Sequence, residues 1–463
     1  MSSSKNDPKK IQKIKSSVFS RGLSMAKMTV NAGASLAGHN IKKTFSNDKV
    51  AHQASWKKFL MNQASSISSE LGELKGSLMK AGQMLSMYGE HFLPPEANEF
   101  LKNLQGDSPA LDWSAIEPVL KKRLSKAQLD QLEIDTEALA CASLGQVHRA
   151  KIKATGQEIV LKIQYPDVDK AIDSDLRALR TLLSVMKLVP KELDLDPLFK
   201  EINDMLVQET NYLIEADRTE EFYDKLRDDP RFVVPKVIRE FSNGKVLATS
   251  YETGERVDSE KVAKLSQERR NQLGLNYLDL YFKEIFTWRT VQTDPHIGNY
   301  RIRVAAGGKD QIVLFDFGAT REFDEKFMKS YRRMIQGAVE GDEELFRRGA
   351  TELKFIQPDD APELRALFEE FCFENVEPFM HPDDPRLPPG TLDADGSYDW
   401  KNSDLPQRAS AKIMKVLRHY SWRAPPRESI FLDRKTGGVF IFMGVLKAVC
   451  RGRDVMTKYL TLQ

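Results

Sequence analysis

The sequence predicts an α+β protein with two lobes, and three changes of pattern along the chain support this prediction. Apolar residues first recur at helical spacing, and from about Glu137 they alternate as they do in short strands. After Gly254 the helical spacing returns and continues toward the end of the chain. We therefore expect a basic, flexible tail over residues 1–45, a helical extension over 46–136, a strand-rich lobe with a helical insertion over 137–253, and a larger helical lobe over 254–463.

Composition excludes several classes of protein. The net charge of +2 gives no overall attraction for nucleic acid, so we expect no nucleic-acid partner. The three cysteines, Cys141, Cys372 and Cys450, lie far apart, which argues against a disulfide framework or a zinc site and fits a reducing compartment. No apolar run approaches the ~18–20 residues that span a bilayer. We therefore expect a cytoplasmic protein without a transmembrane segment.

The beginning of the chain is basic. Residues 1–47 hold nine Lys or Arg residues and one acid, Asp7. A disordered tail and a segment that binds anionic lipid are both consistent with this composition. The stretch "SRGLSMAKMTVNAGASLAGHNIKK" is weakly amphipathic, so we expect peripheral contact with an anionic membrane surface such as an inner membrane.

The strongest helical pattern of the extension is "SSISSELGELKGSLMKAGQMLSMYGEHF". Its Leu and Ala residues share one face, and Lys80 and Gln83 lie on the opposite face. Pro94 and Pro95 end the pattern, because proline cannot continue a helix. The face of Lys80 is either solvated or packed against another part of the protein, since neighbouring glycines permit close approach. The apolar face consists of Leu74, Leu78, Ala81 and Leu85.

Two short strands are expected at Val147–Lys153 and Glu158–Gln164, and the second contains Lys162. Ile159, Leu161 and Ile163 occupy the opposite face of this strand. On a solvated face Lys162 needs nothing more. On a covered face it needs an anionic ligand or a carboxylate. In a nucleotide site such a lysine holds phosphate oxygens and pairs with a helix glutamate.

The segment "ALACASLGQVHRA" before these strands is rich in small residues. Gly145 is its only glycine, so it is not the GxGxxG loop of protein kinases. Small side chains still let backbone amides approach a phosphate closely. A tight packing corner is the alternative interpretation.

Two motifs downstream carry the acids of the predicted site. In "TDPHIGN", Asp294 is placed to orient or deprotonate an acceptor hydroxyl, and Asn299 to bind magnesium. In "IVLFDFG", Asp316 follows an apolar strand. His296 is a candidate base, although a His beside a turn proline more often forms local hydrogen bonds. Four features occur in the order found in protein kinases: a lysine on a strand, a glutamate on a helix, Asp-x4-Asn and Asp-Phe-Gly. Their order predicts a phosphoryl-transfer fold, although this chain lacks the GxGxxG and His-Arg-Asp motifs of protein kinases.

Together these motifs resemble the UbiB/ADCK (AarF-domain) family of atypical protein-kinase-like proteins, over roughly residues 46 to 450. The resemblance rests on "KAGQ", "ACASLGQVH", "VLKIQYP", "ETNYLIEADR", "DPHIGN" and "FDFG". It implies a bilobal protein-kinase-like fold with an N-terminal helical extension. It also implies ATP or ADP and Mg²⁺ as cofactors.

The resemblance further implies a role for each matching position. Lys162, Glu215 and Asp294 would be catalytic, and Asn299 and Asp316 would bind magnesium. The nucleotide would contact Ala142, Ser143, Leu144, Gly145, Gln146, Lys162 and Glu252, the last of these at the adenine hinge. Lys80, Gln83 and Glu209 would hold the extension over the active site.

The family implies a magnesium-dependent kinase or ATPase that supports ubiquinone or related isoprenoid-lipid metabolism and acts on a small-molecule or lipid acceptor. The KAGQ extension would suppress protein phosphorylation, which argues against an ordinary protein kinase. The alternative is a catalytically idle pseudokinase scaffold that binds nucleotide or lipid. Three departures bear on this choice: Asn211 replaces an Asp of the family's ExD motif, Ile297 replaces a Pro, and Cys141 replaces an Ala.

Overall fold

The computed structural model describes residues 76–92, 95–103, 110–186, 188, 195–409, 412 and 426–460. The described residues form two compact units. One contains those up to Asp217 together with Lys236–Tyr251, and the other contains Arg218–Pro235 and the residues from Glu252 onward. The predicted basic tail, the amphipathic segment and residues 46–75 of the predicted helical extension lie outside the described residues.

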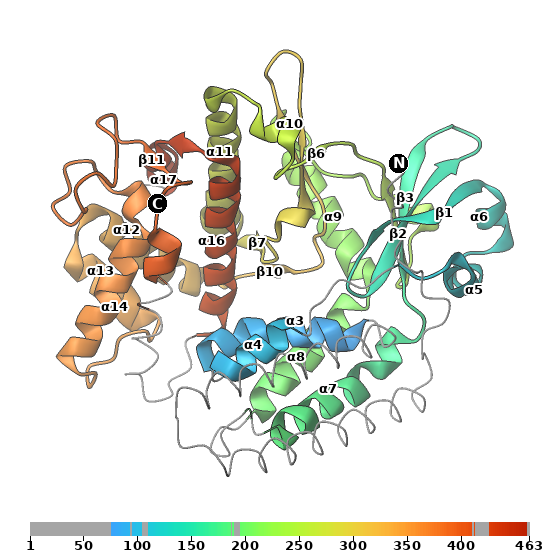
Figure 1. Ribbon diagram of the computed structural model, residues 1–463, viewed down its shortest axis with the longest axis horizontal. Helices are drawn as coiled ribbons and strands as arrows, with labels where there is room; N and C mark the ends of the chain where they lie inside the picture. Colours follow the sequence, from blue (N-terminus) through green and yellow to red (C-terminus); the bar gives the residue numbers. More distant parts are fainter. Residues whose placement is uncertain are drawn as a thin grey trace, which may run out of the picture. The chain divides into compact units, whose positions relative to one another are not determined.

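A four-stranded antiparallel sheet is the centre of the first unit (Figure 1). The two predicted strands are confirmed, and they form the middle of this sheet. Ile159, Leu161 and Ile163 are fully buried on one face, where helix α5 (Trp113–Arg123) packs. The sheet follows the order β1 (Leu132–Cys141), β2 (Gly145–Ile152), β3 (Glu158–Gln164), β5 (Val246–Ser250), and the short helices α6 (Lys126–Asp130) and η2 (Arg239–Phe241) lie at its edges.

The remaining helices of this unit pack against one another (Figure 1). Leu78, Ala81 and Leu85 are buried on one face of α3, as the helical pattern predicts. The helix ends at Phe92, and the next one starts at Pro95, because proline is well accommodated in a first turn. These helices are α3 (Ser77–Phe92), α4 (Pro95–Asn103), α7 (Val168–Val185) and α8 (Asp196–Glu209). The unit also contains the start of α9 (Tyr212–Leu226), which continues into the second unit after Asp217.

Close contacts fix the beginning of α3. Gly76 has a φ of +105°, and a Cβ atom there would lie 2.5 Å from a methyl group of Val168. The Ser77 hydroxyl donates a hydrogen bond of 2.5 Å to Asp175 on α7, and both residues are buried. The extension is therefore tied to α7 by a contact that only glycine permits and by a buried polar bond.

Short strands of the second unit frame the two acid motifs. The sheet order is β4-β9-β8-β6, and β7 pairs separately with β10. These elements are β4 (Phe232–Val233), β6 (Glu255–Arg256), β7 (Thr290–Gln292), η4 (Ile297–Asn299), β8 (Tyr300–Arg303), β9 (Gln311–Leu314) and β10 (Thr320–Glu322).

Helices make up most of the second unit, and α11 and α16 lie side by side (Figure 1). The Pro- and Asp-rich segment from His381 to Trp400 is largely solvent-accessible and ends at a small strand pair. Within the described residues, no helix combines the length and hydrophobicity needed to cross a bilayer. The elements are α10 (Glu260–Ala263), α11 (Gln267–Phe282), the π-helix η3 (Lys283–Trp288), α12 (Glu325–Glu340), α13 (Glu343–Glu352), α14 (Pro362–Asn375), η5 (Glu377–Phe379), β11 (Tyr398–Asp399), α16 (Arg427–Leu446), β12 (Val449–Cys450) and α17 (Gly452–Leu460).

Two adjacent glycines on α16 have opposite surroundings. A Cβ atom on Gly438 would lie 2.1 Å from Cγ of Pro295, whereas a Cβ atom on Gly437 would meet nothing within 4 Å. Gly438 therefore lets α16 touch the loop at Pro295, and Gly437 has no such role.

This contrast predicts opposite effects of the same substitution. Gly438→Ala should lower the free energy of unfolding by about 1–3 kcal/mol, because the methyl group displaces the loop at Pro295. Gly437→Ala should raise it by about 0.5–1 kcal/mol, since alanine favours an exposed helix position. Urea unfolding of both variants measures the difference, and equal effects at the two positions would contradict the close contact.

Candidate active site

The predicted lysine and glutamate of the first unit form an ion pair. Lys162 Nζ lies 2.6 Å from Glu215 Oε1, and the two side chains are 17% and 9% exposed. The lysine comes from β3 and the glutamate from the first turn of α9. The strand face that carries Lys162 is thus covered, and a carboxylate is the partner of the lysine. This outcome agrees with the second interpretation of the sequence, in which a covered Lys162 needs an anionic partner.

The small-residue segment covers the end of β1, the hairpin turn at residues 142–144 and the start of β2. Ala142 N donates a hydrogen bond of 2.8 Å to Gly145 O. A Cβ atom on Gly145 would lie 2.4 Å from Ile163 O and 2.7 Å from the Tyr212 hydroxyl. The packing-corner interpretation is therefore correct for Gly145, and it leaves the main chain of the turn as the part that a phosphate could approach.

Gln146 has a different environment from the rest of that segment. Its side chain is fully buried, accepts a hydrogen bond of 3.0 Å from Leu111 N and bonds to the His148 ring. Burial lowers the pKa of His148, although the Asp135 carbonyl opposes this effect. The Gln146 side chain therefore joins the segment before α5 to the sheet.

The helical extension is joined to α8 by a second ion pair. Lys80 Nζ lies 3.2 Å from Glu209 Oε2, with both side chains largely buried. The face of Lys80 is therefore packed, and Gln83 on the same helix is half-buried. Asn211 accepts a hydrogen bond from Leu213 N at 3.2 Å, so this departure from the family motif caps α9.

In the second unit the Asp294 loop is closed by hydrogen bonds of its own. Asn299 Nδ2 donates to Asp294 O at 3.0 Å and to Asp294 Oδ2 at 3.4 Å. Asn299 O accepts from Phe315 N at 2.9 Å, which connects the loop to the strand before Asp316. His296 accepts a hydrogen bond from Gly298 N, which is the local role expected for it. The structure thus brings Asp294 and Asn299 together.

A buried amide that the sequence analysis did not identify connects both acid motifs. Gln292 Nε2 donates to the carbonyl oxygens of Asp294, at 2.8 Å, and of Asp316, at 3.1 Å. Asp316 has a φ of 58°, a conformation that is costly for a residue with a Cβ atom, and Gly318 N donates to its Oδ1. One amide group therefore fixes the main chain at both acids.

Helix α16 supplies two cations to this region, and they too were not predicted. Arg434 Nη2 lies 2.6 Å from Asp294 Oδ1. Lys435 Nζ lies 3.0 Å from Glu284 Oε2, and these side chains are only 1% and 2% exposed. Burial raises the pKa of Glu284 even though Lys435 opposes it. The sequence signal for them was weak, because Arg434 and Lys435 stand in a charged Asp-Arg-Lys triplet that spacing alone does not distinguish from a solvated helix face.

Glu284 also accepts a hydrogen bond of 3.0 Å from Gln292 N. An ion pair between Lys435 and Glu284 and the hydrogen bonds of Gln292 thus connect α16 to the main chain of Asp294 and Asp316. Phe317 of the Asp-Phe-Gly motif is buried, with its ring 4.7 Å from that of Phe222 on α9.

Glu252 lies where the chain passes from the first unit to the second, directly after Tyr251. Its carboxylate pairs with Arg303 at 2.7 Å, so any hinge contact with a nucleotide would come from the main chain.

The residues present fit a magnesium ion. Because Asn299 Nδ2 donates to Asp294, the Oδ1 atom is the part of this amide that could serve as a metal ligand, and Asp316 has a carboxylate. One carboxylate, one amide oxygen and the oxygens of a bound phosphate are a ligand set that magnesium commonly takes in proteins.

The buried ion pair predicts a non-additive response. Glu284→Gln should lower the free energy of unfolding by about 3–5 kcal/mol, because it leaves Lys435 charged and buried without a partner. Combining it with Lys435→Met should recover most of this loss, since the cation is then removed as well. Denaturant unfolding of the single and double variants checks the coupling, and additive losses would show that the two residues act independently.

Three comparisons with known proteins identify the family to which the chain is similar. The ABC1 atypical kinase-like domain matches residues 103–348. The mitochondrial atypical kinase COQ8 of Schizosaccharomyces pombe is 30% identical over 84% of this chain, which spans 61% of that protein's length. The mitochondrial COQ8 of Saccharomyces cerevisiae is 29% identical over 94% of this chain and 83% of its own.

The structure of an Rv3197–erythromycin complex from Mycobacterium tuberculosis has a TM-score of 0.58, with 24% identity over 89% of this chain and 98% of that one. This likeness concerns the fold alone, and together with the match to the atypical kinase-like domain it confirms the predicted kinase-like α+β fold. The family match covers more than half of the chain and agrees with the resemblance that the motifs predicted. The chain therefore belongs to the ABC1 atypical kinase-like family, the UbiB/ADCK proteins.

Proposed function

We propose that this protein is an ATP-binding, magnesium-dependent phosphotransferase or ATPase. The observation that carries the proposal is the arrangement of Asp294, Asn299 and Asp316, which one buried amide and one loop hydrogen-bond network hold together. A scaffold that only binds partners has no need of this arrangement. The proposed metal site has the Asn299 amide oxygen and the Asp316 carboxylate as its protein ligands.

Each residue has a distinct chemical role in the proposed reaction. Lys162, oriented by Glu215, would hold phosphate oxygens of the nucleotide, and the magnesium ion would neutralise charge that develops on the transferred group. Asp294 would orient the acceptor hydroxyl or a water molecule and take up its proton. The main chain of the Ala142–Gly145 turn would lie over the phosphates, and Glu252 would mark the adenine hinge.

The acceptor is proposed to be a small molecule or lipid of ubiquinone or related isoprenoid-lipid metabolism. The motif resemblance supports this assignment, and the names of the two yeast relatives place those proteins in mitochondria. We further propose peripheral contact with an inner membrane through the basic beginning of the chain.

Binding of magnesium nucleotide is tested by thermal unfolding. ATP or ADP at about 100 times its dissociation constant should stabilise the wild-type protein by about 2.7 kcal/mol, a rise of a few degrees, only when magnesium is present. Asp316→Asn should abolish this rise, because it removes the metal's carboxylate ligand. Asp228→Asn, at a side chain that is 95% exposed, is the matched control and should respond as the wild type does.

Catalysis is separated from binding by Asp294→Asn. This variant should keep the magnesium-dependent rise but lose about 10²–10⁴-fold in ATP turnover or phosphotransfer. A wild-type protein that shows no rise with either nucleotide would favour the scaffold, and the substitutions at Asn211 and Cys141 would then be the first places to seek the cause.

Suppression of protein phosphorylation is proposed to depend on the ion pair between Lys80 and Glu209. Lys80→Glu should break the pair and raise phosphorylation of a generic protein such as casein at least about fivefold, because two like charges at 3.2 Å repel the extension from α8. The double variant Lys80→Glu/Glu209→Lys restores opposite charges and should return the activity to the wild-type level. An equally active double variant would remove the ion pair from the explanation.

A further inference from the structure

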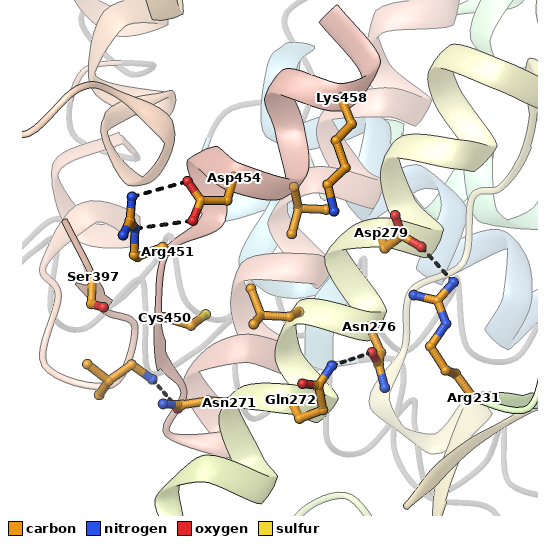
Figure 2. Close-up of a pocket in the computed structure, with 13 residues that line it drawn as sticks. Arg231, Asn271, Gln272, Asn276, Asp279, Ser397, Cys450, Arg451, Asp454 and Lys458 are labelled. Carbon is orange, nitrogen blue, oxygen red and sulfur yellow. Dashed lines mark hydrogen bonds and ion pairs between the residues drawn. The ribbon is translucent and has the colours of Figure 1, made fainter. Parts of the chain in front are cut away.

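A cavity of about 520 Å³ lies between α11 and α17 in the second unit, with β12 at its base (Figure 2). None of the predicted active-site residues lines it. Apart from Asn271 on α11, the lining residues of each helix follow the spacing i, i+3, i+4, i+7, so each helix turns one face toward the cavity. The face of α11 consists of Gln272, Leu275, Asn276 and Asp279, and that of α17 and the residue before it consists of Arg451, Asp454, Val455 and Lys458.

Both carboxylates of the cavity wall are already neutralised. Asp279 Oδ2 lies 2.7 Å from Arg231 and 3.2 Å from Lys283. Asp454 Oδ2 lies 3.2 Å from Arg451 Nε, and the close-up shows the guanidinium facing both carboxylate oxygens (Figure 2). The acids therefore attract no further cation into the cavity.

Two donors of the wall, in contrast, lack acceptors. Lys458 is solvent-exposed, and among the residues that the structure describes no carboxylate lies within ion-pair distance of it, so water is its present partner. Asn276 is only 4% exposed, and its Oδ1 accepts a hydrogen bond of 2.8 Å from Gln272. Its Nδ2 has no acceptor within the described part of the chain and belongs to a side chain that lines the cavity. The Nδ2 atom itself keeps solvent access, so water can hydrate it within the cavity, and an oxygen atom of a ligand can take the place of that water.

Apolar side chains complete the wall. Leu275 and Val455 extend from the two helices, and Val449 lies on β12. Burial raises the pKa of the neighbouring Cys450 thiol to about 12, so Cys450 contributes a neutral, unreactive sulfur atom. The cavity thus offers a cation and an amide donor beside an apolar surface.

We propose that this cavity binds a small amphiphilic acid, in which a carboxylate or phosphate is joined to a short apolar body. Lys458 and Asn276 Nδ2 hold the oxyanion, and Leu275 and Val455 contact the apolar part. The volume lies in the range of about 300–1,000 Å³ that is typical of small-molecule sites. The site is independent of the proposed nucleotide site, since it uses none of the same residues.

The test is a ligand-observed NMR titration of the full chain, without nucleotide or magnesium, at constant ionic strength. Hexyl phosphate and hexanoate are the two acid probes, and hexan-1-ol is the uncharged control. Lys458→Met removes the cation and Lys458→Arg keeps it. Asn276→Asp retains an oxygen for Gln272 but replaces the amide donor with an acceptor. Lys309→Met removes an exposed lysine elsewhere in the same unit and is the matched control.

We expect saturable binding of at least one acid, at least about tenfold weaker binding of hexan-1-ol, and a loss of about tenfold or more in Lys458→Met and in Asn276→Asp. Lys458→Arg and Lys309→Met should bind as the wild type does. Binding of hexyl phosphate alone identifies a phosphate ester, binding of hexanoate alone identifies a carboxylic acid, and binding of both identifies a general oxyanion site. The proposal is overturned if neither acid saturates, if hexan-1-ol binds equally well, or if Lys458→Met binds the acids unchanged.

Discussion

The buried ion pair between Lys435 and Glu284 is the constraint on which the second unit's site depends. Two charges that are almost fully removed from water are tolerated only when each satisfies the other and the remaining lone pairs are hydrogen-bonded. Glu284 meets this condition by accepting from Gln292 N as well. The position of α16 is thereby fixed, and with it the neighbouring contact of Arg434 with Asp294. A helix near the end of the chain thus sets the geometry of a loop that precedes it by more than a hundred residues.

The first unit also contains ion pairs that are largely buried, and their two acids lie on either side of the break between α8 and α9. Glu209 ends α8 and Glu215 lies in the first turn of α9, and Asn211 caps the second helix between them. Because the chain changes direction at this cap, the two acids pair with different cations, Lys80 on the extension and Lys162 on the sheet. Asn211 therefore has a structural role at a position where the family motif places a carboxylate.

Local pattern was sufficient for much of the fold and for part of the site. Alternation placed β2 and β3, and it put Lys162 on the face opposite the core. Strand β1 (Leu132–Cys141) was not predicted, because most of its residues are exposed and its acids and alanines carry no period of two. Gln292, Glu284 and Lys435 were also missed. Their roles arise from contacts between elements distant in sequence, and the spacing within each element does not encode the partner.

The same packing offers a physical connection between the proposed acid-binding cavity and the Asp294 loop. Tyr277 follows Asn276 on α11, and its buried ring lies 5.2 Å from the Tyr300 ring and 4.0 Å from the Phe442 ring on α16. Tyr300 directly follows Asn299. Contiguous packing permits coupling but does not establish it, because coupling requires that the ligand bind two arrangements of these rings with different affinity. If it does, reciprocity requires that magnesium nucleotide change the affinity for the acid by the same factor. An acid that binds with one affinity in both nucleotide states would make the cavity a separate site on the same scaffold.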